Sequence, residues 1–239
     1  MRQISEQVDD AEDHLALDEA LLLEAEDNDG SETLRVWEFE QPTVILGRSS
    51  KVDVEVDRAF CQSNDIPILR RCSGGASVVG GPGCLMYSVV LSLGRQSDLH
   101  KIDVAHGYVM GRVLQAVQRQ VPAVEFQGTC DLTWQLRKCS GNSLRISRNH
   151  LLYHGTVLYD ADLDSIARCL TEAPRQPQYR AGRDHRDFIT NIPTDPVRLA
   201  ADLASIFDAQ VDHGWPLPRD RMMQLRRDRY DCPAWHLRH

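Results

Sequence analysis

The sequence has no stretch of about 18 consecutive apolar residues, the length that a membrane-spanning helix needs. Its first residues are rich in acidic side chains, whereas a secretory or mitochondrial leader would be basic. These two absences predict a cytoplasmic protein. The chain has 239 residues, 42% of them hydrophobic and 26% charged, which is enough for a compact core. We therefore expect a single domain over residues 1–239.

Paired cysteine motifs are also missing. The seven cysteines stand at irregular spacing and none forms a Cys-x-x-Cys pair. An odd number at irregular spacing indicates neither a disulfide framework nor a zinc site. We expect free thiols and no metal centre built by the protein.

Lysine is scarce, because 24 of the 27 basic residues are arginine and only Lys51, Lys101 and Lys138 are lysine. The net charge of -8 argues against a protein that wraps DNA. Residues 1–32 hold 12 of the 35 acidic residues and one basic residue, which leaves 23 acidic against 26 basic residues in the rest. Arginine suits forked recognition of carboxylate and phosphate, whereas lysine is a movable point charge.

Hydrophobic periodicity and turn residues predict groups of strands between helices, without a regular β-α-β alternation. Residues 11–26 suit a helix with an apolar face and an acidic face, and a helix of about five turns begins near Ile102, where Asp98 or Asp103 would cap it. We expect an α+β domain with a mixed, largely antiparallel sheet flanked by helices. Further helices are expected over residues 57–66, 162–170, 195–210 and 218–229, and strands over 33–40, 43–48, 67–71, 123–126, 131–138, 143–147 and 151–159. The first two strands would be joined by a turn at Gln41 and Pro42.

The segment "RRCSGGASVVGG", residues 70–81, places two arginines and a glycine pair ahead of an apolar run. It lacks the Lys-Ser/Thr ending of a P-loop, and the β-branched residues after it indicate a loop between strands. Such a loop binds an anion when its N–H groups converge and an arginine adds a forked charge. The alternative is a tight hairpin with a surface arginine pair, and these residues alone leave both readings open.

A second polar group occurs in residues 128–163. Lys138 ends a predicted strand and is followed by Ser140 and Gly141, while His154 and Gly155 lie in the next long strand. Taken singly, a strand-end lysine is usually solvent-exposed and a strand histidine is usually a core residue. Neither indicates a function by itself.

Together these segments resemble the catalytic domain shared by lipoate-protein ligases, octanoyltransferases and, more distantly, biotin-protein ligases. The resemblance is closest to the lipoate-protein ligase A group and runs over nearly the whole chain. It rests on "LALDEALL", "QPTVILGR", "IPILRRCSGGASVVGGPGCLMYSVVL", "DLTWQLRKCSGNS" and "YHGTVLYDADL", which occur in the family's order and spacing. It implies a fold of the biotin/lipoate protein ligase type, similar to class II synthetases.

The resemblance also implies an activity. Ligases of this family use ATP with Mg²⁺ to activate lipoate or octanoate as the acyl adenylate. They then attach the acyl group to a lysine of a lipoyl acceptor domain, in a 2-oxoacid dehydrogenase complex or the glycine cleavage H protein. The two-domain ligases carry an accessory domain after the catalytic one, and residues beyond about 190 are too few for it. Either a separate accessory subunit acts with this chain or adenylation proceeds differently.

By the same resemblance, Lys138 would be catalytic and would reach between the acyl carbonyl and the α-phosphate. Ala76 replaces the third glycine of the family's Ser-Gly-Gly-Gly run, so we expect it to have a negative φ. Cys130 stands where many ligases have asparagine. Substrate and nucleotide contacts are implied for Arg71, Ser73, Gly74, Gly75, Ala76, Asp131, Ser140, Gly141, His154 and Gly155. The acyl tunnel would be lined by Val78, Val79 and Tyr87, although plain core positions would have the same composition.

The arginine-rich segment 172–188 occupies the place of the family's flexible loop near the adenylate. We expect it to close over the nucleotide phosphate or to dock an acidic acceptor domain, although a plain solvated loop would have the same composition. Its basic residues are Arg175, Arg180, Arg183, His185 and Arg186.

Two other functions compete with the ligase. An octanoyltransferase would take the acyl chain from an acyl-carrier thioester, through a nucleophilic cysteine in known cases. Neither Cys130 nor Cys169 falls where the family places that cysteine, and buried, inert thiols are expected for both. The third alternative is a non-catalytic lipoate-binding homologue, against which the presence of Lys138 argues.

Overall fold

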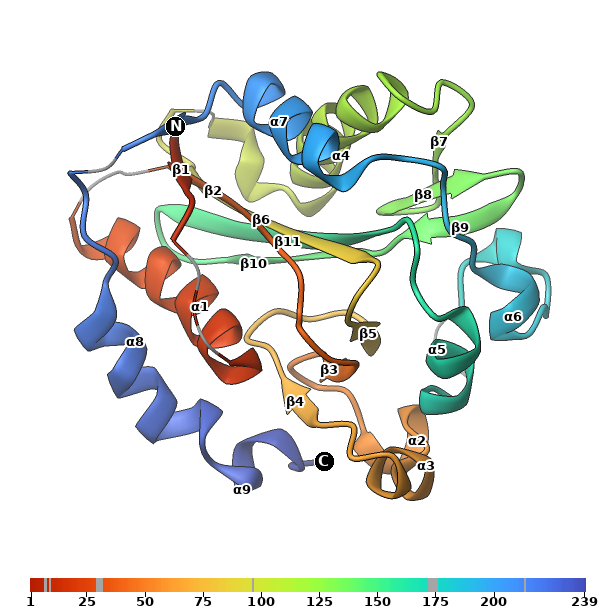
Figure 1. Cartoon of the computed structure of the whole chain (residues 1–239). Coiled ribbons are helices and arrows are strands. Elements are labelled where there is room, and N and C mark those ends of the chain that lie inside the picture. The colour runs from red at the N-terminus through yellow and green to blue at the C-terminus, as the bar shows by residue number, and fades with distance from the viewer. Residues whose placement is uncertain (7, 9, 29–31, 96, 172–175, 213) are drawn as a thin grey trace.

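The computed structural model describes residues 1–6, 8, 10–28, 32–95, 97–171, 176–212 and 214–239. A six-stranded sheet in the order β10-β11-β6-β2-β1-β12 crosses the middle of the molecule (Figure 1). Its pairs are antiparallel except those that β1 makes with β2 and β12, so the sheet is mixed and largely antiparallel, as predicted. The strands are β1 (Arg2–Ile4), β2 (Thr33–Trp37), β6 (Cys84–Ser92), β10 (Asn142–Ile146), β11 (His150–Leu158) and β12 (Gln210–Val211).

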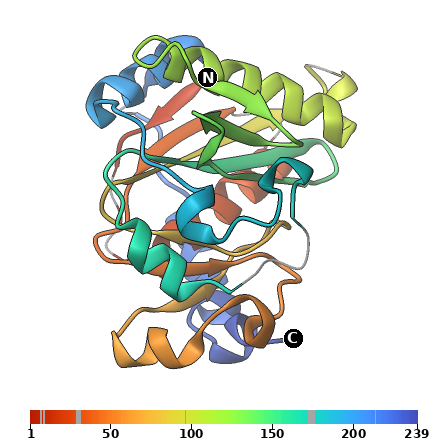
Figure 2. The ribbon, with the colours of Figure 1, turned by 90° about the vertical axis from the view of Figure 1, so that its right-hand side faces the viewer.

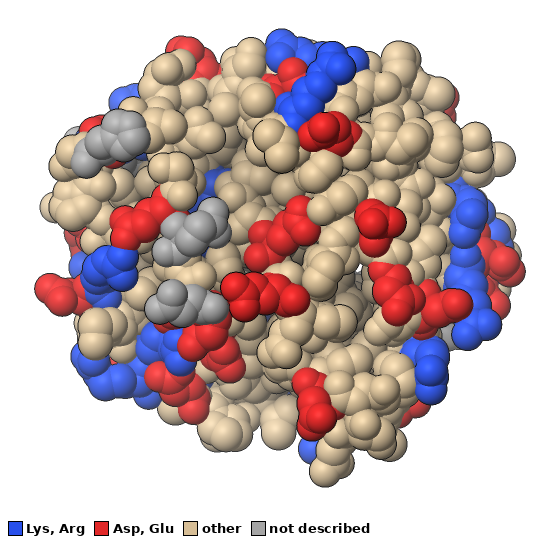
Figure 3. All heavy atoms as spheres, in the orientation of Figure 1, with Lys and Arg blue, Asp and Glu red and all other residues tan. Residues whose placement is uncertain are grey.

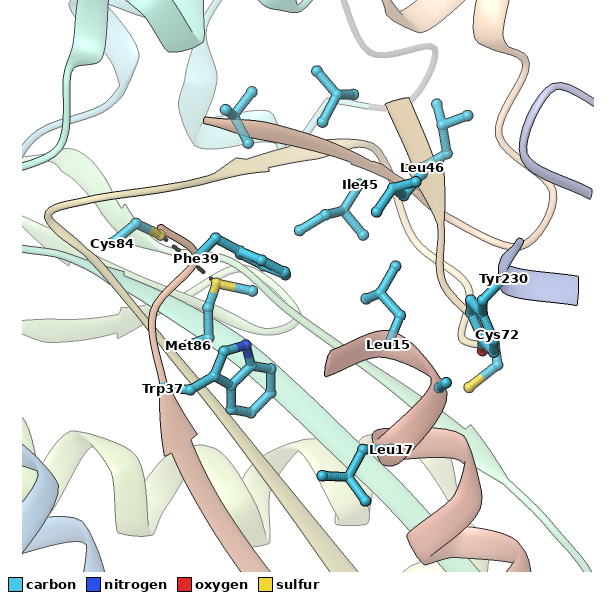
Figure 4. Packing of buried hydrophobic residues seen from close by; sticks show 14 of the residues in the cluster. Leu15, Leu17, Trp37, Phe39, Ile45, Leu46, Cys72, Cys84, Met86 and Tyr230 are labelled. Atoms are coloured by element: carbon cyan, nitrogen blue, oxygen red, sulfur yellow. Dashed lines mark hydrogen bonds between the residues drawn. The ribbon is translucent and has the colours of Figure 1, made fainter. Parts of the chain in front are cut away.

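Helices cover both faces of this sheet (Figure 1). One face carries α4 (Ile102–Gln118) and α7 (Pro196–Ile206), and the other carries α1 (Ala11–Asp27) and α8 (Arg219–Leu225). Successive side chains of β6 point to opposite faces. Leu85 and Tyr87 therefore join the core under α4 and α7, whereas Cys84 and Met86 pack with residues of α1. Figure 4 shows the second core, in which Met86 and Trp37 lie beside residues of α1 and β3.

Two three-stranded sheets complete the fold (Figure 2). The first has the order β4-β3-β5, with β3 (Thr43–Leu46), β4 (Ile68–Arg70) and β5 (Val78–Gly80), and the second joins β7 (Glu125–Gln127), β8 (Asp131–Trp134) and β9 (Arg137–Ser140). Because β4 and β5 flank β3 instead of pairing with each other, the loop between them is not a tight hairpin, and that alternative is wrong. Short helical segments are α2 (Val52–Glu55), α3 (Arg58–Ser63), α5 (Leu163–Cys169), α6 (His185–Phe188), α9 (Pro233–His236), the 3₁₀ turns Ser97–His100 and Gln178–Arg180, and the π turn Arg226–Tyr230.

The segments 33–40 and 43–48 contain β2 and β3, as predicted, and these two strands belong to different sheets. One strand prediction needs correction. The segment 131–138 is not one strand. It turns at Gln135 and Leu136, whose φ values of 52° and 62° lie in the left-handed region. Lys138 is therefore in the second strand of a hairpin, β8-β9.

The predicted cap of α4 is also wrong. Neither Asp98 nor Asp103 occupies the cap position, which belongs to Lys101. The Asp98 carboxylate instead pairs with the Lys101 ammonium at 3.0 Å.

In the described residues, no helix is long and apolar enough to cross a membrane. Basic and acidic side chains are interspersed over the face drawn in Figure 3.

Arg70 ties the last residues of the chain to the loop after β3. Its guanidinium is fully buried, and it donates to the carbonyls of Gly47 and Ser50 at 2.7 and 2.8 Å. It also donates to the carbonyls of His236 and Arg238 at 3.1 and 2.6 Å. Burial, helped by the nearby Arg238, lowers the pKa of Arg70 to about 10, so the group is still a cation at neutral pH.

Replacing Arg70 with methionine is expected to lower the free energy of unfolding by about 3 kcal/mol, because several buried carbonyls lose a charged donor. Urea unfolding measures the change. Arg58→Met is the control, since the Arg58 side chain is 50% exposed and pairs with an exposed aspartate. Surface substitutions of this kind stay within about 0.5 kcal/mol of the parent. Equal unfolding midpoints for the two variants would show that Arg70 does not anchor the C-terminal residues.

Candidate active site

A cavity of about 350 Å³ opens between α1, the glycine loop (residues 71–77) and strands of all three sheets. One part of its wall is apolar, and Figure 4 shows Leu15, Trp37, Ile45 and Met86 converging there. The polar part is lined by Asp18, Arg71, Gly75, Ala76, Cys130, Asp131, Lys138, Gly141, Asn142, Ser143, His154, Gly155 and Thr156. Most of the residues predicted for the site thus meet around one cavity.

Arg71 organises the glycine loop from inside. It donates to the Ile45 carbonyl at 3.0 Å, the Ser73 hydroxyl at 3.0 Å and the Ala76 carbonyl at 3.0 Å, and also to the Gly74 carbonyl. Burial lowers the pKa of Arg71 to about 10, so the guanidinium stays charged at neutral pH. Arg71 is therefore one of the cavity-lining residues and at the same time the support of its own loop.

The carbonyls of Gly74, Gly75 and Ala76 are bound into the protein, whereas the N–H groups of these three residues are not. Ser143 donates to the Gly74 carbonyl at 2.8 Å, and Ser50 donates to the Gly75 carbonyl at 3.3 Å. Among the described residues, none accepts a hydrogen bond from the N–H groups of Gly74, Gly75 or Ala76. A loop with bound carbonyls and unbound N–H groups suits an anion. The structure thus has the backbone polarity that the anion-binding alternative required.

The backbone of the loop also fits its sequence. Gly75 has a φ of 82°, where a side chain would be strained, and a Cβ there would lie 3.0 Å from Arg71 Nη2. Ala76 is not among the described non-glycine residues with positive φ, so the expectation of a negative φ at this position is confirmed.

Lys138 lies beside Asp131 on the hairpin β8-β9. Its Nζ is 2.7 Å from Asp131 Oδ1, and Tyr179 donates to Asp131 Oδ2 at 2.7 Å. A Cβ at Gly141 would lie 3.1 and 3.2 Å from Lys138 Cε and Nζ, so a side chain there would press on the end of Lys138. Lys138 also lines a neighbouring cavity of about 130 Å³, together with Ser140, Gly141, Thr156, Arg180 and His185.

His154 connects the cavity wall to the glycine loop. Its Nε2 lies 2.5 Å from Ser73 Oγ and its Nδ1 lies 3.0 Å from Asp18 Oδ2. A Cβ at Gly155 would come within 1.6 Å of Asn142 Oδ1, so this position needs glycine. Sequence reasoning missed Asp18 and Asn142. Asp18 stands in "LALDEALL", where its acidic side chain predicted a solvent-facing position.

Ser73 and Gly74 belong to the loop but do not line either cavity. Of the tunnel residues, Val78 lines both cavities and Val79 only the smaller one. Tyr87 is fully buried in the core and reaches the site through a hydrogen bond that its hydroxyl donates to Asn142. Tyr87 therefore supports the wall without lining it.

Arginine side chains of the segment 172–188 donate to backbone carbonyls of the segment itself and of Leu136. Arg183 donates to the carbonyls of Leu136 and Tyr179 at 2.9 Å each, and Arg180 donates to the Arg183 carbonyl at 2.8 Å. Arg180 and His185 line the smaller cavity, whereas Arg183 lines neither. Arg186 pairs with Asp164 at 3.1 Å, and Arg175 lies outside the described residues. Contact of this segment with a nucleotide stays a prediction.

All seven cysteines are free thiols, as expected. Cys130 was expected to be buried but is half-buried in the cavity wall, and burial, followed by the charge of Asp131, raises its pKa. Cys169 is buried, and burial raises its pKa as well. Since the thiolate is the nucleophile, neither environment activates its cysteine.

A family model for the lipoyl protein ligase A/B catalytic domain matches residues 10–195. The chain belongs to this family. It is 24% identical to lipoate-protein ligase 1 of Staphylococcus aureus over 219 residues, which cover 86% of this chain and 64% of that protein. It is 28% identical to the octanoyltransferase LipM of Carboxydothermus hydrogenoformans over 255 residues, 95% of this chain and 94% of that protein.

Solved structures show the same fold. A bi-partite lipoate protein ligase of Thermoplasma acidophilum, studied with its E2 lipoyl domain, superposes with a TM-score of 0.83 at 19% identity and covers 99% of this chain and 95% of its own. A lipoate-protein ligase A with bound ATP gives a TM-score of 0.81 at 18% identity, over 99% and 98% of the two chains. The predicted fold class is confirmed. The chain spans less than two thirds of the length of S. aureus ligase 1, so its full activity is a matter for proposal.

Proposed function

We propose that this protein is an ATP-dependent lipoate-protein ligase. It activates lipoate or octanoate as the acyl adenylate and attaches the acyl group to a lysine of a lipoyl acceptor domain. The observation that carries the proposal is the position of Lys138, which lines both the partly apolar cavity and the smaller one beside it. The first cavity suits a medium-length acyl chain, because such pockets are mostly apolar with a few placed polar groups.

The residues at the junction fit the chemistry of adenylation. A carboxylate is a poor acyl donor because oxide would have to leave, whereas an acyl adenylate has the phosphate of AMP as its leaving group. Negative charge then moves from one oxygen to another, and a lysine on a flexible stem can follow it. The amides of Gly74, Gly75 and Ala76 and the charge of Arg71 would stabilise the ligand's oxygens beside Lys138. In this proposal Ser140, Gly141 and Arg180 face the nucleotide.

We further propose that Mg²⁺ enters with ATP. This ion is usually held by one or two carboxylates together with substrate phosphates. Asp131 supplies such a carboxylate in the cavity wall, next to Lys138. Its second oxygen accepts from Tyr179, which keeps the carboxylate in place.

The proposed partners are lipoyl acceptor domains, either of 2-oxoacid dehydrogenase complexes or of the glycine cleavage H protein. The T. acidophilum ligase studied with its E2 lipoyl domain is bi-partite. By analogy we propose that residues 1–239 act as one catalytic domain and that a separate accessory subunit assists the adenylation step. The analogy rests on fold, so the acceptor has to be identified by transfer assays.

Pyrophosphate release tests the proposal. Purified protein with ATP, Mg²⁺ and lipoate or octanoate is expected to release pyrophosphate and to bind a non-hydrolysable acyl adenylate analogue. The analogue should bind without an accessory subunit, because residues of this chain line the cavity. Failure of both, together with transfer of octanoate from acyl-carrier protein to a lipoyl domain, would contradict the ligase and establish the transferase.

Octanoyltransfer is the second candidate, because LipM matches the chain over nearly its whole length. That reaction would require a nucleophile, and Cys130 is the cysteine that lines the larger cavity. Burial and Asp131 raise its pKa above the usual value, so the neutral thiol prevails at neutral pH and the thiolate forms only in more alkaline solution.

We therefore expect Cys130→Ala to keep at least half of the acylation activity. Alkylation of Cys130 by iodoacetamide at neutral pH should be slower than that of glutathione, because the thiolate is the reactive form. Cys232→Ala is the control, as Cys232 is half-buried outside the cavity. Abolished acyl transfer in Cys130→Ala alone, with an acyl thioester trapped on the parent protein, would favour the transferase.

A further inference from the structure

A chain of buried hydrogen bonds runs from the middle of α1 to the glycine loop. Asp18 is 1% exposed, and its Oδ2 lies 3.0 Å from His154 Nδ1. On the other side of the imidazole, His154 Nε2 lies 2.5 Å from Ser73 Oγ, which accepts from Arg71 Nε at 3.0 Å. One chain of hydrogen bonds thus links four residues from three distant parts of the sequence.

The charge of Asp18 determines which atoms donate and which accept in this chain of hydrogen bonds. Burial by itself would raise the pKa of Asp18, but the Arg35 cation and the hydrogen bonds from His154 and Ser88 outweigh it, so the pKa lies below its usual value. An ionised carboxylate only accepts, and therefore His154 Nδ1 must carry the hydrogen. In the neutral ring the other nitrogen, Nε2, carries no hydrogen, so it accepts a hydrogen bond from the Ser73 hydroxyl.

Asp18 itself is fixed from behind. Arg35 Nη1 donates to Asp18 Oδ1 at 2.5 Å, and Ser88 donates to the same oxygen at 2.8 Å. Arg35 also lies 3.0 Å from His14 Nδ1 and donates to the His14 carbonyl at 3.2 Å. Burial and Arg35 lower the pKa of His14 to about 3, so this ring is neutral and accepts from the guanidinium. The carboxylate is thus anchored to α1, β2 and β6.

We propose that Asp18 is a positioning residue of the active site, which acts on the glycine loop through His154 and Ser73. The carboxylate fixes the tautomer of His154, and His154 turns the Ser73 hydroxyl proton away from Arg71. The Ser73 oxygen then accepts from Arg71, which holds the carbonyls of Gly74 and Ala76 and leaves the loop amides available to the ligand. The inference deepens the proposed function, since the ligand is the activated acyl group of that reaction.

The order of the three groups is that of an Asp-His-Ser triad, in which the serine would be a nucleophile. Two observations assign Ser73 to positioning instead. Ser73 is 1% exposed and does not line the cavity, whereas Asp18 and His154 do. Its oxygen also receives the Arg71 N–H, which holds it toward the loop support.

Nitrogen NMR of the His154 ring together with steady-state kinetics tests the role. In the parent protein Nδ1 should carry the hydrogen and Nε2 should be bare. In Asp18→Asn the amide can also donate, so the Nε2–H tautomer should appear and kcat/KM should fall by about 10²-fold, as expected for a misplaced binding group. The control is Glu26→Gln, on the same helix, because Glu26 lies 3.5 Å from His150 and has no link to the loop. This variant should keep both the His154 signals and the activity.

Asp18→Asn also leaves the Arg35 charge buried without its partner, which can prevent folding. Asp18→Asn/Arg35→Met removes both charges and should show the same tautomer change and the same loss of kcat/KM. If neither variant folds, Ser73→Ala, which changes no charge, should show the same loss with the His154 ring retained.

Three results would overturn the proposal: an unchanged His154 tautomer in the folded Asp18 variants, a changed tautomer with normal kcat/KM, or an acyl ester on Ser73. If neither Asp18 variant folds, normal kcat/KM in Ser73→Ala would overturn it too. Failure of the proposed function looks different. In that case the parent protein neither binds the acyl adenylate analogue nor releases pyrophosphate, while the tautomer of His154 still reports whether Asp18 controls the ring.

Discussion

Replacing Lys138 with alanine is expected to lower kcat/KM for pyrophosphate release by about 10² to 10³-fold, equivalent to about 3 to 4 kcal/mol of transition-state stabilisation. The physical reason is the place of its ammonium group, which lines the two cavities and is the movable cation between them. Binding of ATP and of lipoate or octanoate should change less than turnover, because the negative charge that Lys138 follows develops during the reaction. Pre-steady-state pyrophosphate release measures the chemical step directly.

Three variants make this result specific. Lys101→Ala removes another of the three lysines, whose side chain is 55% exposed and pairs with Asp98, and it should leave kcat/KM unchanged. Removal of Lys138 also leaves Asp131 without its cation. Because Asp131 is also the proposed Mg²⁺ ligand, Asp131→Asn alone is measured beside Lys138→Ala/Asp131→Asn, so that the two effects are separated. If the double variant regained activity within tenfold of the parent, or if Lys138→Ala kept a tenth of it, Lys138 would not be the catalytic group.

The parts of the fold that sequence predicted best are those with strong local patterns. The apolar runs of β6 and β11 are buried strands, and the periodic segment 11–26 is α1. Burial of Asp18 and Glu19 on α1 could not be predicted from periodicity, because their partners come from distant segments. Arg35 binds Asp18, and Arg145 binds Glu19 at 2.6 Å. A charge enters a core only when such partners are present, and a local pattern does not show them.

The same limit explains the errors at the site. The hairpin β8-β9 turns at Gln135 and Leu136 without the glycine or asparagine that usually signals positive φ, so one strand was expected. Arg70 and Arg71 were read as a pair, but adjacent side chains at a strand end point in opposite directions. One anchors the C-terminal residues, and the other supports the glycine loop. The sequence motifs predicted that Lys138, His154 and the glycine loop lie together. The chain of buried hydrogen bonds from Asp18 to the loop could be found only in the structure, because its residues are distant in sequence.

Gly47 shows how closely the glycine loop is held from behind. A Cβ at Gly47 would lie 1.9 Å from the Gly75 carbonyl oxygen and 3.0 Å from its carbon, both of which are backbone atoms. Backbone cannot rotate away as a side chain can, so Gly47→Ala must displace the loop. We expect the free energy of unfolding to fall by about 1 to 3 kcal/mol, as in other overpacked sites. The kcat/KM for pyrophosphate release should fall by about 10²-fold, because a misplacement near 1 Å has that cost.

Gly107→Ala is the matched control for this variant. A Cβ at Gly107 meets nothing within 4 Å, and the residue lies in the middle of α4, away from both cavities. It should stabilise the protein by about 0.5 to 1 kcal/mol, since alanine favours the helix over glycine, and it should leave kcat/KM unchanged. Urea unfolding and binding of the acyl adenylate analogue separate the two effects of Gly47→Ala. A variant that is destabilised but binds and turns over normally would show that the position of the Gly75 carbonyl does not control the anion site, and the role given to the loop amides would then be wrong.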